Sequence, residues 1–370
     1  MKPFRRDLAQ GKWTPKCLIP GAPSLMLTKS SGDFVNTVLT KSPGVFVNTM
    51  SVEILEFESK VLRGNPLGDP AVRRTPVYLP PSYPKGRYPV HYVLTGFTGF
   101  GEMLLARGAW SESLPERLDR LIATRKMGEA IVVMPDCFTR YGGSQYLNSS
   151  ATGRYEDHVV RELVPHVDRR YRTDGRRAVL GKSSGGYGAM VLGMRHPDVF
   201  QALACHSGDL YFEYCYLPDF PKALDTFRKF GGPAKFVKAW EKMAKRGRGD
   251  LHPALNTLAM ASCYSPRGKG FDLPFDLETG EMRADVWKRW KAWDPVEMLD
   301  RHAKDLKRLR AVFVDCGSRD QFALHHGARI FVAKARRLGV RPIHEEFDDD
   351  HSNIAYRYDR SFAALSKALS

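Results

Sequence analysis

From residue 51 onward, apolar and polar residues follow patterns typical of β-strands. The segment VEILEFESKVL alternates apolar and polar residues, and RRTPVYLP does the same before the turn PSYPKGRYP. Shorter apolar runs follow, which are typical of strands buried on both faces of a sheet. We predict such strands at residues 91–94, 130–134, 178–180, 202–206, 310–314 and 343–347.

Apolar residues at helical spacing separate most of these strands. The predicted helices cover residues 112–126, 154–170, 186–194, 324–338 and 353–368. Strands that alternate with helices indicate an α/β fold with a mostly parallel central sheet flanked by helices. In such a sheet, active residues collect in loops beyond the carboxyl ends of the strands. We therefore predict one such domain over residues 50–370.

Residues 210–300 interrupt this alternation. Phe236, Val237, Trp240, Met243 and Ala244 form an apolar stripe on a lysine-rich helix, and VWKRWKAWDP closes the segment. We interpret the segment as a helical insertion that packs its stripe on the main core. Because it follows the sixth strand, it is also expected to lie over the site as a lid.

The first 49 residues differ from the rest. They contain a tandem duplication, LTKSSGDFVNTV at 27–38 and LTKSPGVFVNTM at 39–50, and little sustained periodicity. A unit repeated only twice is too short for a solenoid. We predict a poorly ordered N-terminal extension over 1–49, or upstream sequence before a natural start at Met50.

Composition limits the classes of protein that this chain can represent. Its 370 residues are 43% hydrophobic, which allows a large core. No apolar run is long enough to span a membrane, and MKPFRRDLAQGKW lacks the apolar stretch of a secretory signal. The six cysteines have no C-x-x-C spacing, which favours reduced, buried thiols in a cytoplasmic protein. We expect no cofactor and no metal, and a homo-oligomer is compatible with these features.

The net charge of +16 raises the question of a nucleic-acid partner. Positive charge is concentrated in residues 1–49, with a net charge of +5, and in residues 220–250, with +6. No basic stripe interleaved with aromatic residues accompanies these segments. We interpret them as solvated basic faces, or as surfaces that attract acidic substrates, and predict no nucleic-acid partner.

The most informative motif lies in RAVLGKSSGGYG at 177–188. It contains a G-x-S-x-G pattern at 181–185, between a predicted strand and a predicted helix. So sharp a strand-to-helix turn needs glycine or a very small residue two positions before and after the serine. Ser184 fails this test because Lys182 stands two positions before it, so Ser183 is the candidate nucleophile. A glycine-rich structural turn is the alternative.

A serine hydroxyl is a weak nucleophile at neutral pH and needs a base, usually a histidine oriented by a carboxylate. A strand-to-helix turn that carries a nucleophilic serine is called a nucleophile elbow. In proteins with this elbow, the catalytic residues follow one another along the chain in the order serine, acid, histidine. The strand at 310–314 is followed by DCGSRD, and the strand at 343–347 by DDDHS. We predict His351 as the base and Asp320 as the acid.

Other residues compete for both roles. Asp315, at the very end of its strand, and Asp209, in HSGD, are alternative acids. His206 precedes the expected acid, and His325 and His326 fall at a helix start. The run DDDH at 348–351 could bind a metal, but no matching ligand cluster exists elsewhere in the sequence.

Charge that forms on a substrate's carbonyl oxygen needs backbone N–H donors. The amide of Ser184 follows the nucleophile directly and stands at a helix N-terminus, where the dipole favours negative charge. The loop LTGFTG after the strand at 91–94 is the other source, because its glycines let the backbone approach. We choose the amide of Phe97 there. An ordinary strand-end turn is the alternative.

Seven segments and their order along the chain are characteristic of one protein family: LTGFTG, VVMPD, GRYEDHVVRELVPHVDRRYRT, GKSSGGYGAM, HSGD, DCGSRD and DDDHS. Through them, residues 52–368 resemble the putative-esterase family of α/β-hydrolases. That family includes enterochelin-esterase-like proteins, S-formylglutathione hydrolases, feruloyl esterases and mycolyltransferases. Thr95 departs from the pattern, since many relatives carry histidine there. The resemblance implies an α/β-hydrolase fold with these functional residues: Ser183, Asp320 and His351 as triad, Phe97 and Ser184 at the oxyanion hole.

We predict a serine carboxylesterase that hydrolyses a small-molecule ester through an acyl-enzyme. An acyltransferase would need the same triad, and a catalytically silent binding protein is the alternative from another class. The sequence contains aromatic residues suited to aryl or siderophore-like esters, although packing in core or lid is the competing interpretation. They are Tyr141, Phe212 and our predicted substrate-binding residues Tyr146, Tyr211 and Trp240.

Overall fold

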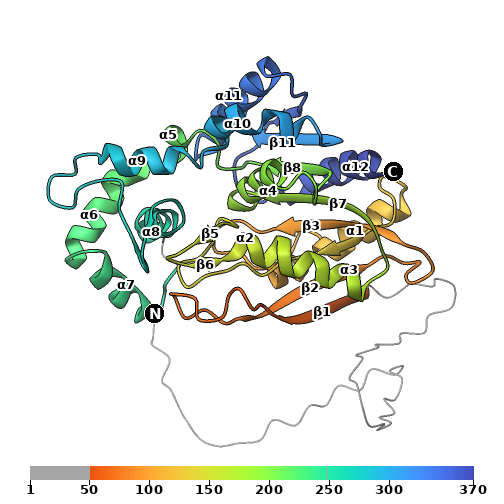
Figure 1. The fold of residues 1–370 in the computed structure, drawn as a ribbon, viewed down its shortest axis with the longest axis horizontal. Helices are drawn as coiled ribbons and strands as arrows, with labels where there is room; N and C mark the ends of the chain where they lie inside the picture. The colour runs from red at the N-terminus through yellow and green to blue at the C-terminus, as the bar shows by residue number, and fades with distance from the viewer. Residues whose placement is uncertain (1–50, 248) are drawn as a thin grey trace, which may run out of the picture. The chain divides into compact units, whose positions relative to one another are not determined.

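An eight-stranded sheet forms the centre of the computed structural model, which describes residues 51–247 and 249–370 (Figure 1). Its strand order is β1-β2-β4-β3-β7-β8-β11-β12. Only β2 opposes its neighbours, and the strands from β4 to β12 run parallel. The predicted mostly parallel sheet is thus confirmed. The strands are β1 Ser51–Glu58, β2 Val72–Leu79, β3 Tyr88–Leu94, β4 Ile131–Val133, β7 Thr173–Lys182, β8 Ala202–His206, β11 Ala311–Gly317 and β12 Ile343–Phe347.

Helices cover both faces of this sheet. Helices α1 (Leu114–Ala123) and α12 (Tyr358–Leu369) pack on one face, where Val93 joins their apolar residues. Val90, Tyr92 and Leu94 of the same strand join the core on the other face. Two-sided coverage explains why the central strands are continuous apolar runs. The second face is covered by α2 Tyr155–Asp157, α3 Val164–Arg170, α4 Ser184–Arg195, α10 Pro295–Leu306 and α11 Leu324–Arg337.

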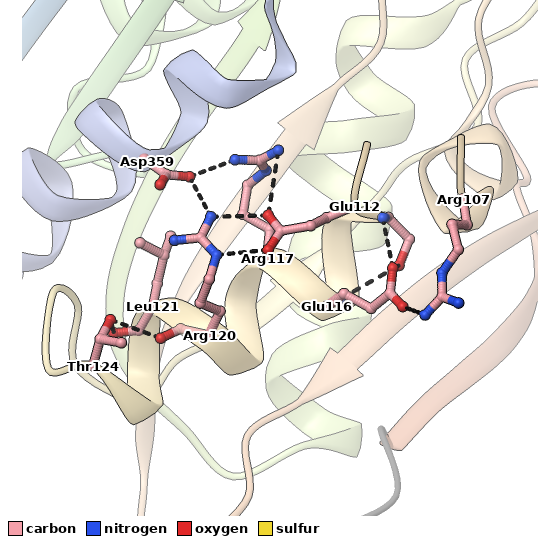
Figure 2. Close-up of polar contacts among 9 residues, drawn as sticks. Arg107, Glu112, Glu116, Arg117, Arg120, Leu121, Thr124 and Asp359 are labelled. Carbon is pink, nitrogen blue, oxygen red and sulfur yellow. Dashed lines mark hydrogen bonds and ion pairs between the residues drawn. The ribbon is translucent and has the colours of Figure 1, made fainter. Parts of the chain in front are cut away.

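An ion-pair cluster joins α1 to α12 (Figure 2). Arg117 is buried, and its guanidinium lies 2.5 Å from Asp359 and 3.5 Å from Glu112. Arg120 lies 2.6 Å from Glu112 and 3.0 Å from Asp359, so two cations share two carboxylates. Such sharing satisfies the buried Arg117 charge, which would otherwise be costly. The cluster therefore fixes how α12 lies beside α1.

Residues 210–300 form a largely helical segment between β8 and β11. Figure 1 shows its helices α6, α7 and α9 gathered beyond one end of the sheet. Phe236 of the predicted stripe is buried, and Val237, Trp240 and Met243 pack partly buried against the main core. The elements are α5 Phe212–Cys215, α6 Phe220–Phe230, α7 Pro233–Glu241, α8 His252–Tyr264 and α9 Ala284–Lys291, with a hairpin of β9 Pro266–Arg267 and β10 Gly270–Phe271. A second small hairpin pairs β5 Asn148–Ser149 with β6 Gly153–Arg154.

Cysteines in the described part of the chain carry free, buried thiols: Cys137, Cys205, Cys215, Cys263 and Cys316. Among the described helices, none combines the length and the apolar character that crossing a membrane requires. Cys17, the tandem duplication and the extension predicted over 1–49 lie outside the described residues.

Candidate active site

The turn between β7 and α4 presents Ser183 at the carboxyl end of the sheet. Its φ and ψ are 59° and −128°, a strained conformation for a residue with a side chain. A Cβ added at Gly181 would lie 2.5 Å from the backbone of Gly185, and one added at Gly185 would lie 2.2 Å from the carbonyl oxygen of Leu94. Both positions therefore need glycine. The Ser183 N–H donates to the carbonyl of His206 at 2.9 Å, which holds the turn on β8.

Ser183, His351 and Asp320 lie in one chain of hydrogen bonds. His351 Nε2 is 3.0 Å from Ser183 Oγ, and His351 Nδ1 is 2.7 Å from Asp320 Oδ2. The other carboxylate oxygen of Asp320 accepts from the Phe322 N–H at 2.9 Å. Asp320 and His351 are 4% and 8% exposed, so their contact is shielded from water. A carboxylate at Nδ1 leaves Nε2 free to accept the serine proton.

The alternative acid, Asp315, belongs to a different and sealed set. Its Oδ1 lies 2.6 Å from His206 Nδ1, and its Oδ2 accepts from Arg357 at 2.9 Å. His206 Nε2 is in turn 2.8 Å from the Ser361 hydroxyl. Asp315 and His206 lie under α12, to which Ser361 belongs, and all three residues are at most 1% exposed. A substrate cannot reach them, whereas Asp320 contacts His351 in the set that includes Ser183.

Two backbone amides beside Ser183 are available as donors. The first four N–H groups of a helix lack intrahelical acceptors, and Ser184 begins α4. The Phe97 N–H has no hydrogen bond within the described part of the chain. A Cβ at Gly96 would come within 3.2 Å of the Ser183 Cβ, so this loop passes very close to Ser183. The Tyr146 hydroxyl, which donates to the Thr95 carbonyl at 2.7 Å, supports the loop from inside.

A small pocket of about 40 Å³ adjoins Ser183. Helix α8 contributes His252 and Asn256, so the 210–300 segment forms part of its wall. Burial lowers the pKa of His252, which favours its neutral imidazole. The lining residues are Phe97, Ser183, Ser184, Asp209, Cys215, Tyr216, His252, Asn256, Phe322 and Leu324.

The structure does not bring the predicted substrate-binding residues to this pocket. Tyr146 is buried under α4, and its ring occupies the space that a Cβ of Gly188 would need. The half-buried Tyr211 ring contacts Tyr214 and the Lys291 ammonium. Trp240 donates to the Arg246 carbonyl at the surface of α7. All three side chains meet packing partners, which sequence position alone does not reveal.

Sequence reasoning missed most of the pocket wall. Asp209, the last residue of HSGD, was considered only as an alternative acid, and Phe322 stands two residues after DCGSRD, so proximity to these motifs was the available signal. His252 and Asn256 stand four residues apart and share a helix face. The segment HPALN that contains them has no catalytic motif, so only tertiary structure reveals their place.

Comparisons with known proteins agree with this fold. The family described as "Putative esterase" matches residues 71–355. A ferulic acid esterase superimposes with a TM-score of 0.56 at 21% identity, over 88% of this chain and 100% of that one. The S-formylglutathione hydrolase of Agrobacterium tumefaciens gives 0.56 at 17% identity, over 87% and 97% of the chains. That of Staphylococcus aureus (FrmB) gives 0.52 at 15% identity, over 87% and 99%.

At these identities the solved structures establish the fold, whereas the family match extends over most of the chain. This chain therefore belongs to the putative-esterase family, and it is an enzyme of the α/β-hydrolase class that acts on carboxylic esters.

Proposed function

We propose that the protein is a serine carboxylesterase that works through an acyl-enzyme. Ser183 Oγ attacks the ester carbonyl carbon while His351 Nε2 takes the hydroxyl proton. The resulting oxyanion accepts hydrogen bonds from the Phe97 and Ser184 amides. When the bond to the alcohol oxygen breaks, His351 returns the proton to the leaving alkoxide. Water then attacks the acyl group, with His351 as base, and releases the acid and Ser183.

The observation that supports this proposal most is the chain of hydrogen bonds from Ser183 through His351 to Asp320. Each contact has a length suited to proton transfer or orientation. Asp320 acts by holding the imidazole in the tautomer that leaves Nε2 unprotonated. The strained backbone of Ser183 also fits a nucleophile elbow, because strain of this kind persists where function requires it.

Labelling with a fluorophosphonate probe tests the proposal. We expect stoichiometric modification of Ser183 in the folded protein, with none in Ser183→Ala and little in His351→Ala. Ser361→Ala is the matched control, because Ser361 also lies beside a histidine but is sealed from solvent. It should label like the unmodified chain. A folded protein that resists the probe, or one modified at another serine, would contradict the assignment.

We also propose that residues 210–300 act as a lid. The support is that α8 supplies two pocket residues, His252 and Asn256. A group bound to Ser183 would contact α8, so amide hydrogen exchange in this helix should slow after phosphonylation. Exchange that is unchanged in α8 would argue against the lid.

A further inference from the structure

Asp209 is a buried carboxylate in the wall of the pocket beside Ser183. It follows β8 and is 7% exposed. Its Oδ2 accepts from Gln145 Nε2 at 3.1 Å, from the Tyr216 hydroxyl at 2.9 Å and from the Ser184 hydroxyl at 3.3 Å. One oxygen is thus fully occupied, and these contacts hold the carboxylate in one orientation.

The other oxygen, Oδ1, has no partner within the described residues and is not sealed from solvent. Because Asp209 lines the pocket, this oxygen is available to a group bound there. No lysine or arginine is among the described residues that line this pocket, and Asp209 forms no ion pair in the described part of the chain. Burying a carboxylate without a cation or a full set of donors is costly, so the site lacks a donor that a ligand can supply.

The position of the pocket indicates which part of an ester it receives. It touches Ser183 and both candidate oxyanion donors, Phe97 and Ser184, and its wall residue Phe322 packs against the His351 ring. Because the oxyanion donors hold the carbonyl oxygen, a group bound here lies close to the carbonyl carbon. We assign the pocket to the acyl side of the substrate. A volume of about 40 Å³ places a donor on that side close to the carbonyl.

We propose that Asp209 selects esters whose acyl group carries a hydrogen-bond donor next to the carbonyl, with an ammonium group preferred over a hydroxyl. This inference rests on the proposed esterase function. The donor binds Asp209 Oδ1, and the apolar walls formed by Phe322 and Leu324 contact the remaining acyl atoms. A site built to bind a polar group rejects the analogue that lacks it, because its own buried group is then left unpaired.

Three ethyl esters of equal branching test this: 2-methylpropanoate, lactate and alaninate, which place CH3, OH and NH3⁺ at the same carbon. In Asp209→Asn, the amide oxygen can still accept the three hydrogen bonds that Oδ2 accepts in the unmodified enzyme. The NH2 group then takes the place of Oδ1 and cannot accept a hydrogen bond from the substrate. The kcat/KM advantage of lactate and alaninate over 2-methylpropanoate should then fall by about 10- to 100-fold, more for alaninate. Intrinsic reactivities cancel when these ratios are compared between the two proteins.

Asp294→Asn is the matched control. Asp294 is also a buried carboxylate, but it accepts from the backbone N–H groups of Tyr211, Phe212 and Val296 and does not line the pocket. In Asp294→Asn, the kcat/KM ratios of lactate and alaninate to 2-methylpropanoate should equal those of the unmodified enzyme. Equal losses for all three esters in Asp209→Asn, or unchanged ratios, would overturn the inference while leaving the esterase intact. Absence of both ester hydrolysis and Ser183 labelling in the unmodified enzyme would instead refute the proposed function.

A second measurement needs no variant. Boronic acids bind serine hydrolases as analogues of the tetrahedral intermediate. 1-Aminoethylboronic acid should inhibit the unmodified enzyme at least about tenfold more tightly than its isostere isopropylboronic acid. Equal inhibition constants would overturn the inference even if Asp209→Asn fails to fold.

Discussion

The chain contains two Ser–His–Asp sets, one that borders a pocket and one that is sealed, so the same substitution at two places tests the acid assignment. Asp320 lies beside His351, and Asp315 lies beside His206, at distances of 2.7 and 2.6 Å. We predict that Asp320→Asn removes activity and keeps stability, whereas Asp315→Asn removes stability and keeps activity.

The expected loss in Asp320→Asn follows from the tautomer of His351. The Phe322 N–H already occupies Oδ1, so the asparagine NH2 would face His351 Nδ1 and place the ring proton on Nε2. Ser183 then has no base. Substitutions of this kind lower kcat by about 10⁴, or roughly 5.5 kcal/mol in the barrier.

The expected loss in Asp315→Asn comes from Arg357, whose side chain is 12% exposed and 2.9 Å from Asp315. Removing one partner of a buried ion pair costs about 3–5 kcal/mol. Glu345 still lies 2.5 Å from Arg357, which places the cost near the lower end, about 3 kcal/mol. The Ser183 N–H donates to the backbone carbonyl of His206, and this contact does not depend on the His206 side chain. The kcat of Asp315→Asn should therefore change less than about tenfold.

The assay combines kcat/KM for a p-nitrophenyl ester with urea unfolding of both variants. If Asp315→Asn lost as much kcat as Asp320→Asn while remaining fully stable, the acid would be misassigned. Equal, small effects of both substitutions would refute the tautomer argument.

Three further predictions concern the elbow, the pocket and the buried histidines. Gly185→Ala would place a Cβ 2.2 Å from the Leu94 oxygen and should abolish probe labelling, whereas Gly249→Ala, in open surroundings, should leave labelling intact. Lengthening the acyl chain of p-nitrophenyl esters from acetyl to octanoyl should lower kcat/KM at least about tenfold, because the pocket measures about 40 Å³; equal rates would contradict this. Burial lowers the pKa of His91 to about 4 and that of His158 to about 3, and neither ring has a hydrogen bond among the described residues. The unfolded chain binds protons below about pH 6.5 while the folded one does not, so the free energy of unfolding should fall by about 1.4 kcal/mol per histidine per pH unit below that value. Urea unfolding at pH 7 and 5.5 checks this, and His91→Leu should reduce the slope.

The sheet could be predicted because its strands are buried on both faces. The apolar run at 91–94 is shorter than a typical helix and ends in the glycine-containing loop LTGFTG, and both features favour a strand. Boundaries were less accurate. Strand β7 begins at Thr173, five residues before the apolar run at 178–180, because its polar start still pairs with Tyr88 of β3 across an irregularity in register. Backbone pairing of this kind leaves no hydrophobic signal.

The polar site could be predicted only where local sequence determines local geometry. The elbow is such a case, since steric exclusion at Gly181 and Gly185 acts within five residues. Local sequence does not determine aromatic contacts, because nothing near a tyrosine in the sequence indicates whether its ring will contact a substrate or a helix. Tyr146 meets α4 through the space left by Gly188, a contact between residues 42 positions apart.

The two Ser–His–Asp sets explain why residue type alone does not locate catalysis in this fold. Asp315 is still within β11, where Ala311, Phe313 and Asp315 alternate onto the face that α12 covers. The Asp315 side chain points under this helix and is sealed from solvent. Asp320 stands beyond the end of β11, and His351 follows β12 in the same way. The position relative to the strand end, more than the composition of the set, therefore determines which carboxylate can serve a substrate.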